Sequence, residues 1–230
     1  MFKTLVLSSF LVFVAGREIK LINNCGHTIW PGWQGQSATP NGGGTTLGAG
    51  KTHVLNVPDN WTGGRIWART GCNSKFECET GGCGNSEHCN GAWGANGVTL
   101  AEFGLKKWDN MDFYDVSLVD GFNVQLQIKA VGGSGSCKEC GHCKENLLKT
   151  CPGDLKENKN GHVVECQSAC TKFKKPEYCC TGSHSTAATC GPTNYSKWFK
   201  ERCPTAYSYA YDDKTSTFSC TNAHYEVHFC

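Results

Sequence analysis

The chain has 230 residues, of which 17 are Cys and 28 are Gly, and its formal net charge is only +2. A nearly neutral chain has no general electrostatic attraction to nucleic acid or to anionic membranes, so we expect no nucleic-acid partner. A chain of this length can bury a core without cross-links. So many thiols therefore indicate an oxidising secretory route, because the cytosol would keep them reduced.

The N-terminus has the pattern of a signal peptide. Lys3 supplies a positive start, an apolar run covers residues 5–15, and the small residues Ala15 and Gly16 precede Arg17. The run is too short for a membrane span, which needs ~20 residues. We expect residues 1–16 to be removed and the mature protein to be secreted into the extracellular space.

Short alternating segments rich in β-branched and aromatic residues, separated by glycine, predict β-strands. In the segment at 64–70, Ile66 and Ala68 lie on one face, while Arg65, Trp67 and Arg69 lie on the other. Strands are expected, in chain order, at residues 18–23, 27–30, 52–57, 64–70, 99–105, 113–118, 122–128, 215–219 and 225–229.

Asp120-Gly121 separates two of these segments, 113–118 and 122–128. An Asp-Gly pair between alternating segments is a strong signal for a tight turn. The pair therefore predicts a β-hairpin.

Two cysteine-rich stretches interrupt the strand pattern. Residues 71–91 hold four Cys among Gly and polar residues, and residues 136–203 hold ten Cys, with short helices expected near 166–173 and 193–202. We predict a mainly β protein with an antiparallel β-sandwich core formed by residues 17–70, 92–135 and 204–230. The first stretch is a small disulfide-stapled insertion, and the second is a larger loop and helix insertion.

Several separated motifs of the chain resemble those of the thaumatin-like family, which is pathogenesis-related family 5 and includes osmotin and zeamatin. The resemblance covers nearly the whole mature chain and implies the thaumatin-like fold. The motifs are Gly64-Arg-Ile-Trp-Ala-Arg-Thr-Gly-Cys72, Thr99-Leu-Ala-Glu-Phe103, Phe113-Tyr-Asp-Val-Ser-Leu-Val-Asp-Gly-Phe-Asn123, Glu177-Tyr-Cys-Cys180, Cys190-Gly-Pro-Thr-Asn-Tyr-Ser196 and Ala206-Tyr-Ser-Tyr-Ala-Tyr-Asp-Asp213.

The resemblance also implies a pairing of sixteen cysteines that spacing alone does not determine. The implied disulfides are Cys25–Cys230, Cys72–Cys78, Cys83–Cys89, Cys137–Cys220, Cys143–Cys203, Cys151–Cys166, Cys170–Cys179 and Cys180–Cys190.

Cys140 has no partner in this scheme. The spacing of Cys137, Cys140 and Cys143 is compatible with a metal site, but a secretory route argues against one, and no metal is expected. A free or capped thiol, exchange with a neighbouring cysteine and pairing with a second chain remain open.

Members of the family carry a cleft lined by one Arg, one Glu and three Asp. In this sequence the matching residues are Arg65, Glu102, Asp115, Asp120 and one of the pair Asp212 and Asp213, of which Asp212 is preferred. Aromatic residues near these positions are candidates either for sugar stacking or for the core: Phe103, Phe113, Tyr114, Phe122 and Tyr209.

Such a cleft suits a hydroxyl-rich ligand, because carboxylates and a guanidinium form strong directional hydrogen bonds. Clustered carboxylates also raise one another's pKa, as in glycosidases. In that case Glu102 is the expected proton donor and Asp115 the nucleophile or base. The alternative is structural: Asp120 caps its turn, and Asp115 pairs with Arg65 or Arg69.

The leading hypothesis is a secreted, antifungal, defence-type protein that binds β-1,3-glucan or a related cell-wall polysaccharide, acting as a monomer without a cofactor. The alternatives are a weak endo-β-1,3-glucanase, and an interaction protein that acts on a microbial membrane or binds an enzyme or receptor. Sequons at Asn60 and Asn194 are candidate glycosylation sites.

Overall fold

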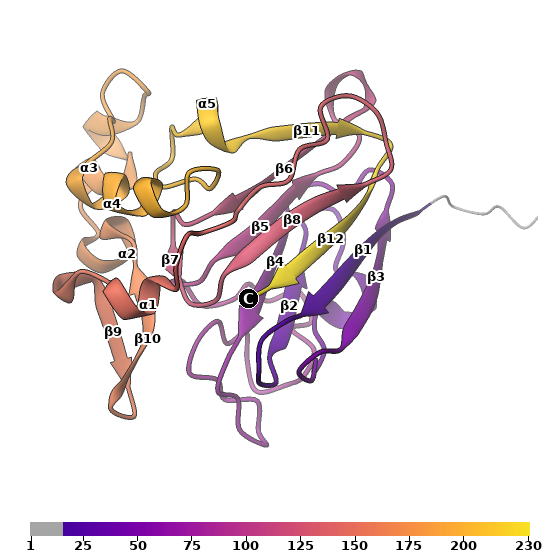
Figure 1. Cartoon of the computed structure of the whole chain (residues 1–230), viewed down its shortest axis with the longest axis horizontal. Helices are drawn as coiled ribbons and strands as arrows, with labels where there is room; N and C mark the ends of the chain where they lie inside the picture. The colour runs from indigo at the N-terminus through magenta and orange to yellow at the C-terminus, as the bar shows by residue number, and fades with distance from the viewer. Residues whose placement is uncertain (1–15) are drawn as a thin grey trace, which may run out of the picture.

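The computed structural model describes residues 16–230, so the predicted signal peptide lies outside the described residues except for Gly16. Two β-sheets pack face to face (Figure 1). One sheet has four strands, in the order β3 (Thr52–Pro58), β1 (Gly16–Asn23), β12 (His224–Phe229) and β8 (Leu126–Val131). The other has five, in the order β11 (Phe218–Thr221), β6 (Met111–Ser117), β5 (Leu100–Gly104), β4 (Gly64–Arg69) and β2 (Trp30–Gln34).

The predicted sandwich is present, with one exception to its antiparallel pairing. β1 and β12 pair in parallel, whereas every other pair between named strands is antiparallel in the described part of the chain. Parallel neighbours need a long connection between them. Here that connection is almost the whole chain, because β1 is the first described strand and β12 the last.

The core lies between the two sheets and follows the alternation of the strands. In β1 every second residue is buried, including Ile19 and Leu21. Aromatic rings from both sheets meet at the centre, where Phe103 lies 5.3 Å from Tyr225 between ring centroids and Tyr114 lies 5.1 Å from Tyr225. Aromatic contacts of this kind contribute roughly 0.5–1.5 kcal/mol beyond the area they bury.

The hairpin predicted at Asp120-Gly121 is wrong. β6 and β8 belong to different sheets, and the short strand between them, β7 (Gly121–Phe122), pairs with β10 (His162–Gln167) instead. Gly121 has φ +138°, and a Cβ there would lie 2.9 Å from the carbonyl oxygen of Cys166. The glycine is required because two backbones approach closely, not because the chain reverses.

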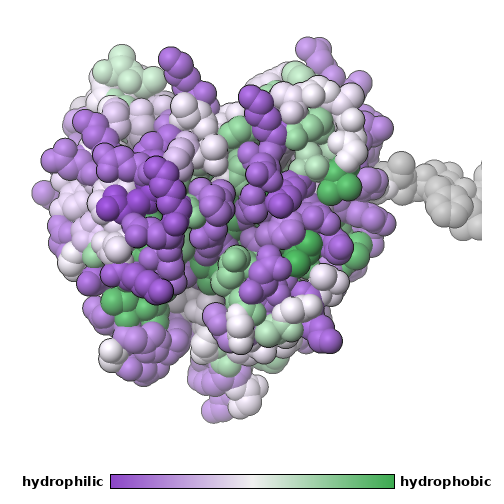
Figure 2. All heavy atoms as spheres, in the orientation of Figure 1, coloured by the Kyte–Doolittle hydropathy of each residue, from purple (hydrophilic) through white to green (hydrophobic). Residues whose placement is uncertain are grey.

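The larger insertion forms its own lobe beside the sandwich (Figure 1). β9 (Lys156–Lys159), β10 and β7 make a three-stranded sheet. The helices of this lobe are α1 (Leu147–Thr150), α2 (Ala169–Phe173), α3 (Pro176–Cys179) and α4 (Asn194–Arg202). α2 and α4 overlap the predicted helices, but residues 166 and 167 belong to β10, and the hairpin of β9 and β10 was not predicted. Figure 2 shows indentations at the boundary between the lobe and the sandwich on a mainly hydrophilic face.

Two further predicted strands are shifted in the structure. The strand expected at 27–30 begins at Trp30, and the residues expected to begin the strand at 215–219 instead belong to α5 (Asp213–Ser216), which precedes β11. Both segments combine β-branched residues with turn formers, so their local pattern does not fix the strand start.

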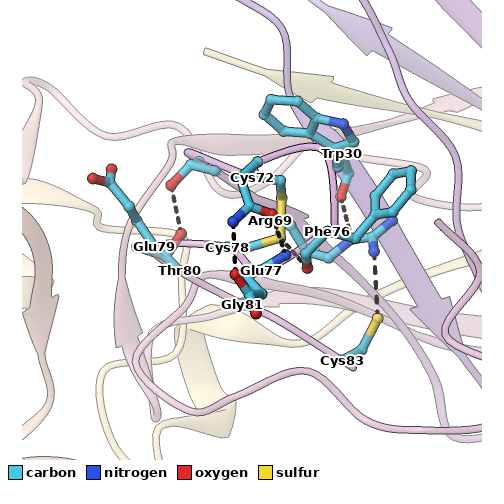
Figure 3. Close-up of a disulfide and its surroundings, with 12 residues drawn as sticks. Trp30, Arg69, Cys72, Phe76, Glu77, Cys78, Glu79, Thr80, Gly81 and Cys83 are labelled. Atoms are coloured by element: carbon cyan, nitrogen blue, oxygen red, sulfur yellow. Dashed lines mark hydrogen bonds between the residues drawn. A yellow bond between two sulfur atoms is a disulfide. The ribbon is translucent and has the colours of Figure 1, made fainter. Parts of the chain in front are cut away.

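The small insertion is anchored by a buried arginine at the end of β4 (Figure 3). Arg69 is fully buried and donates hydrogen bonds to the carbonyl oxygens of Trp30, Ser86 and Glu87, at 2.8, 3.0 and 2.7 Å. Burial lowers the pKa of its guanidinium to about 10. Arg69 therefore holds the insertion against β2 and is not available to pair with Asp115.

The structure contains eight disulfides, and they join the same pairs that the family resemblance implies. Cys140 is a buried free thiol, 1% exposed. Its neighbours in the metal-like spacing, Cys137 and Cys143, are both in disulfides and so are not available as metal ligands. Within residues 16–230 no helix has the length and apolarity needed to cross a membrane.

Candidate ligand-binding cleft

Three of the predicted site residues lie side by side across the five-stranded sheet. The strand register places Arg65 of β4 opposite Glu102 of β5, and Glu102 opposite Asp115 of β6. Adjacent strands lie about 4.8 Å apart, so directly opposed side chains are within interaction distance. Residues that are far apart in the sequence thus form one charged row on the outer face of the sheet.

The row is part of the floor of a cleft of about 600 Å³. Asp120 also lines the cleft, from the segment that follows β6. Four of the five predicted site residues are therefore brought together. Other residues of the wall come from loops, from β6 and from α5: Trp93, Lys107, Phe113, Tyr207 and Asp213.

Arg65 connects the acidic row to an aromatic wall. Its Nε–H donates to Oε1 of Glu102 at 2.8 Å, and its guanidinium carbon lies 5.4 Å from the ring centroid of Trp93. A guanidinium has five N–H donors, and among the described residues only the Nε–H is engaged by a hydrogen bond. The remaining donors are open to a ligand.

Asp115 is the least satisfied acid of the site. Its Oδ1 is buried and has no hydrogen-bond partner among residues 16–230. Burial raises the pKa of Asp115 well above its usual value, and the neighbouring Glu102 carboxylate raises it further, against the opposing charge of Arg65. Neither Arg65 nor Arg69 forms an ion pair with Asp115 in the described structure, so the predicted structural pairing is absent.

The pKa values of the other two cleft acids are also raised. Burial raises the pKa of Glu102, and Arg65 opposes that rise. Burial likewise raises the pKa of Asp120, again opposed by Arg65. Arg65 forms a hydrogen bond with Glu102 and none with Asp115. The roles predicted from the sequence, with Glu102 as proton donor and Asp115 as nucleophile or base, stay predictions.

The choice of Asp212 as the fifth residue is corrected. Asp213 lines the cleft, and its Oδ1 accepts a hydrogen bond from the hydroxyl of Tyr207 at 2.8 Å. Asp212 instead accepts hydrogen bonds from Ser208 and pairs with Lys200 at 3.0 Å. Adjacent residues point in different directions here, because Asp212 closes the loop before α5 and Asp213 begins the helix.

The model of the thaumatin family matches residues 23–230. The chain belongs to the thaumatin family. It is 50% identical to pathogenesis-related thaumatin-like protein 3.5 of Cryptomeria japonica, with 91% of this chain and 88% of that protein covered. It is 48% identical to pathogenesis-related protein 5 of Arabidopsis thaliana, covering 96% and 95%. A Prunus avium protein named glucan endo-1,3-beta-glucosidase is 43% identical over the full length of both chains.

Among solved structures, the thaumatin-family chain shares its fold with a laminaripentaose-producing β-1,3-glucanase whose structure was determined with laminaritetraose. The TM-score is 0.63 at 11% identity, covering 93% of this chain and 98% of that one. At this identity the likeness concerns the fold alone.

The aromatic candidates of this family member divide between cleft and core. Phe113 lines the cleft, whereas the rings of Phe103, Tyr114 and Phe122 belong to the core and Tyr209 lies in a smaller neighbouring pocket. Sequence reasoning missed Trp93 and Tyr207. Trp93 lies in a glycine-rich loop without periodicity, so its sequence neighbours give no sign that it reaches the cleft; Tyr207 lies inside a family motif, Ala206–Asp213, which was the available signal.

Both sequon asparagines are exposed. Asn60 lies in the turn between β3 and β4, and Asn194 is the first residue of α4. The hydroxyl of Ser196, the third residue of the second sequon, is already used in the cap of α4, where it accepts from the backbone N–H of Thr193 at 2.8 Å. Glycosylation therefore remains a prediction, with Asn60 the better placed of the two.

Proposed function

We propose that this thaumatin-family protein is a secreted, antifungal defence protein that binds β-1,3-glucan or a related cell-wall polysaccharide in the cleft. The observation that carries the proposal is the open charged row, in which Asp115 has an unpartnered acceptor and Arg65 has unused donors. The names of the pathogenesis-related relatives support the defence role.

A polysaccharide suits this row because each sugar hydroxyl is both a donor and an acceptor. A hydroxyl that donates to Asp115 or Glu102 satisfies a carboxylate, and one that accepts from Arg65 satisfies a guanidinium N–H. An anionic ligand would be repelled by the carboxylates, and a purely apolar one would leave Asp115 unpaired at a cost of about 1–3 kcal/mol.

The eight disulfides support an extracellular location, where cell-wall glycans are found. Extracellular fluid is oxidising, so the cross-links persist there.

The first test is co-sedimentation of the native protein with insoluble β-1,3-glucan. The double variant Asp115→Ala, Asp120→Ala is expected to bind at least about tenfold more weakly, since hydrogen bonds to charged groups contribute about 1.5–3 kcal/mol each. A matched control is Glu139→Ala, Glu201→Ala, which removes two exposed carboxylates outside the cleft. Equal retention of the double variant and the native protein would overturn the proposal.

Weak endo-β-1,3-glucanase activity is the second candidate. It is favoured by the adjacency of Glu102 and Asp115, both with raised pKa values, and by the name of the Prunus avium relative. Retaining glycosidases hold their two carboxyl groups about 5–5.5 Å apart, and inverting enzymes about 6.5–9.5 Å. Opposed positions on neighbouring strands favour the shorter separation.

The second test is the release of reducing sugar from a linear β-1,3-glucan. Asp115→Asn and Glu102→Gln should each abolish release if the two carboxyl groups act together. No release by the native protein after prolonged incubation would remove this candidate and leave glucan binding untouched.

A further inference from the structure

Two tryptophans are unusually exposed for such large apolar side chains. Trp93 is 44% exposed and Trp108 is 79% exposed. Neither belongs to the acidic row, and exposed aromatic surface is costly in water unless a ligand covers it. Trp93 lines the cleft already described, and Trp108 contacts Phe113, which lines it.

Trp93 stands at the end of the cleft that is nearest to the larger insertion. It lines the main cleft and also a small adjoining pocket that it shares with Leu100 and Asn96. Its loop is held against the sheet, because a Cβ on Gly94 would lie only 2.4 Å from Nε1 of the buried Trp67. The Trp93 ring is therefore presented by an anchored loop, with Arg65 against it at 5.4 Å.

Trp108 lies outside the cleft lining but next to two residues of it, Lys107 and Phe113. It lies in the short 3₁₀ helix η2 (Trp108–Asn110), and its ring meets that of Phe113 edge-on, with centroids 5.9 Å apart. Phe113 lines the cleft, and its cross-strand partner is Gly104, which carries no side chain to cover the ring. An aromatic surface thus continues from the cleft floor to its outer rim.

The distance between the two ends follows from the strand geometry. Leu100, Glu102 and Gly104 are alternate residues of β5 and face the cleft together. Leu100 lies at the Trp93 end and Gly104 at the Phe113 end, and four residues of strand span about 13 Å. Trp93 adjoins Leu100 and Arg65, whereas Trp108 adjoins Phe113, the partner of Gly104, so the two rings lie toward different ends of this span.

We infer that Trp93 and Trp108 are stacking platforms at the two ends of the cleft, which select an extended, flat-faced β-glucan chain longer than a disaccharide. This inference rests on the proposed function. Glucose rings in a β-linked chain have equatorial hydroxyls and apolar C–H faces. The C–H faces suit aromatic rings, while the equatorial hydroxyls reach the charged row between the platforms. A chain with bulky substituents on its ring faces would be excluded.

The experiment compares the binding of two β-1,3-linked oligosaccharides, laminaribiose and laminarihexaose, by isothermal titration calorimetry. The native protein should bind the hexaose at least about tenfold more tightly than the biose. Trp93→Ala and Trp108→Ala should each weaken hexaose binding by about fivefold or more and change biose binding by less. Trp93→Phe and Trp108→Phe should recover most of the lost affinity. Val131→Ala, which shortens an exposed apolar side chain on β8 outside the cleft, is the matched control.

The outcomes separate the two proposals. Equal hexaose affinity in the native protein and in both alanine variants would overturn the stacking platforms while glucan binding stands. Equal affinity of the native protein for laminaribiose and laminarihexaose would likewise contradict the inferred preference for an extended chain. If the native protein binds neither oligosaccharide, and neither of them changes its thermal unfolding temperature, the proposed function is overturned, and with it this inference.

Discussion

Asp112 and Asp115 lie three residues apart on β6 and face opposite sides of the five-stranded sheet. Asp112 is fully buried, and both of its oxygens are satisfied. Its Oδ1 accepts from the backbone N–H of Lys106 at 2.9 Å, and its Oδ2 accepts from the Tyr225 hydroxyl at 2.9 Å and from Arg17 at 3.2 Å. Asp115 instead has an oxygen without a partner.

The difference separates a structural carboxylate from a binding one. Arg17 links Asp112 to Asp59 and to the backbone carbonyl of Ala223, so that the Asp112 cluster joins both sheets and a loop. A buried charge with every partner in place acts as a cross-link, and its removal leaves the other groups unpaired. A carboxyl left open in a cleft stabilises nothing in the free protein and is available to a ligand.

The largest expected effect concerns the satisfied acid. Asp112→Ala leaves the Arg17 guanidinium and the Tyr225 hydroxyl buried without their acceptor, and should lower the free energy of unfolding by about 3–5 kcal/mol. Unfolding in guanidinium chloride, with the disulfides intact, measures this loss of stability. Asp115→Ala removes the same group from the same strand, so an equal loss in that variant would contradict the distinction.

A smaller effect, with the opposite sign, is expected for Asp115→Asn. Because the pKa of Asp115 is raised in the folded protein, the folded state binds its proton more tightly than the unfolded state, whose Asp pKa is about 3.9. Stability therefore falls as the pH rises from that value through the raised folded pKa. The native protein should lose more stability than the variant between pH 4 and pH 7.

Denaturant unfolding at several pH values between these limits measures this difference. Glu201→Gln, which neutralises an exposed carboxylate on α4, is the control and should follow the native curve. Parallel stability curves for the native protein and Asp115→Asn would contradict the raised pKa.

The smallest effect concerns the exposed edge of the Asp112 cluster. Lys106 pairs with Asp59 at 2.9 Å, and both side chains reach solvent. Lys106→Ala keeps the backbone N–H that binds Asp112, so it should cost less than about 1 kcal/mol. High salt should reduce the difference further. A loss as large as that of Asp112→Ala would mean that the cluster is not held together by its buried members.

Much of the sandwich and of the charged row was predictable from the sequence, because the strands there alternate apolar and polar residues in the way that their buried and exposed faces require. Alternation identified the strands around Arg65, Glu102 and Asp115, and the family motifs pointed to these residues. The hairpin at Asp120-Gly121 failed because an Asp-Gly pair does not distinguish a turn from a close backbone contact. β9 and β10 were missed because their stability comes from packing against β7 and from disulfides, not from an apolar pattern. Trp93 and Asp213 depend on loop conformations that no periodicity encodes.

The parallel pairing of β1 with β12 has a consequence for the order of folding. β12 lies between β1 and β8, so the four-stranded sheet is completed only when residues 224–229 have been synthesised. Until then β1 and β8 each present an open edge, and open edges can pair with other chains. A nascent chain therefore depends on β12 to close a sheet that β1 began about 200 residues earlier.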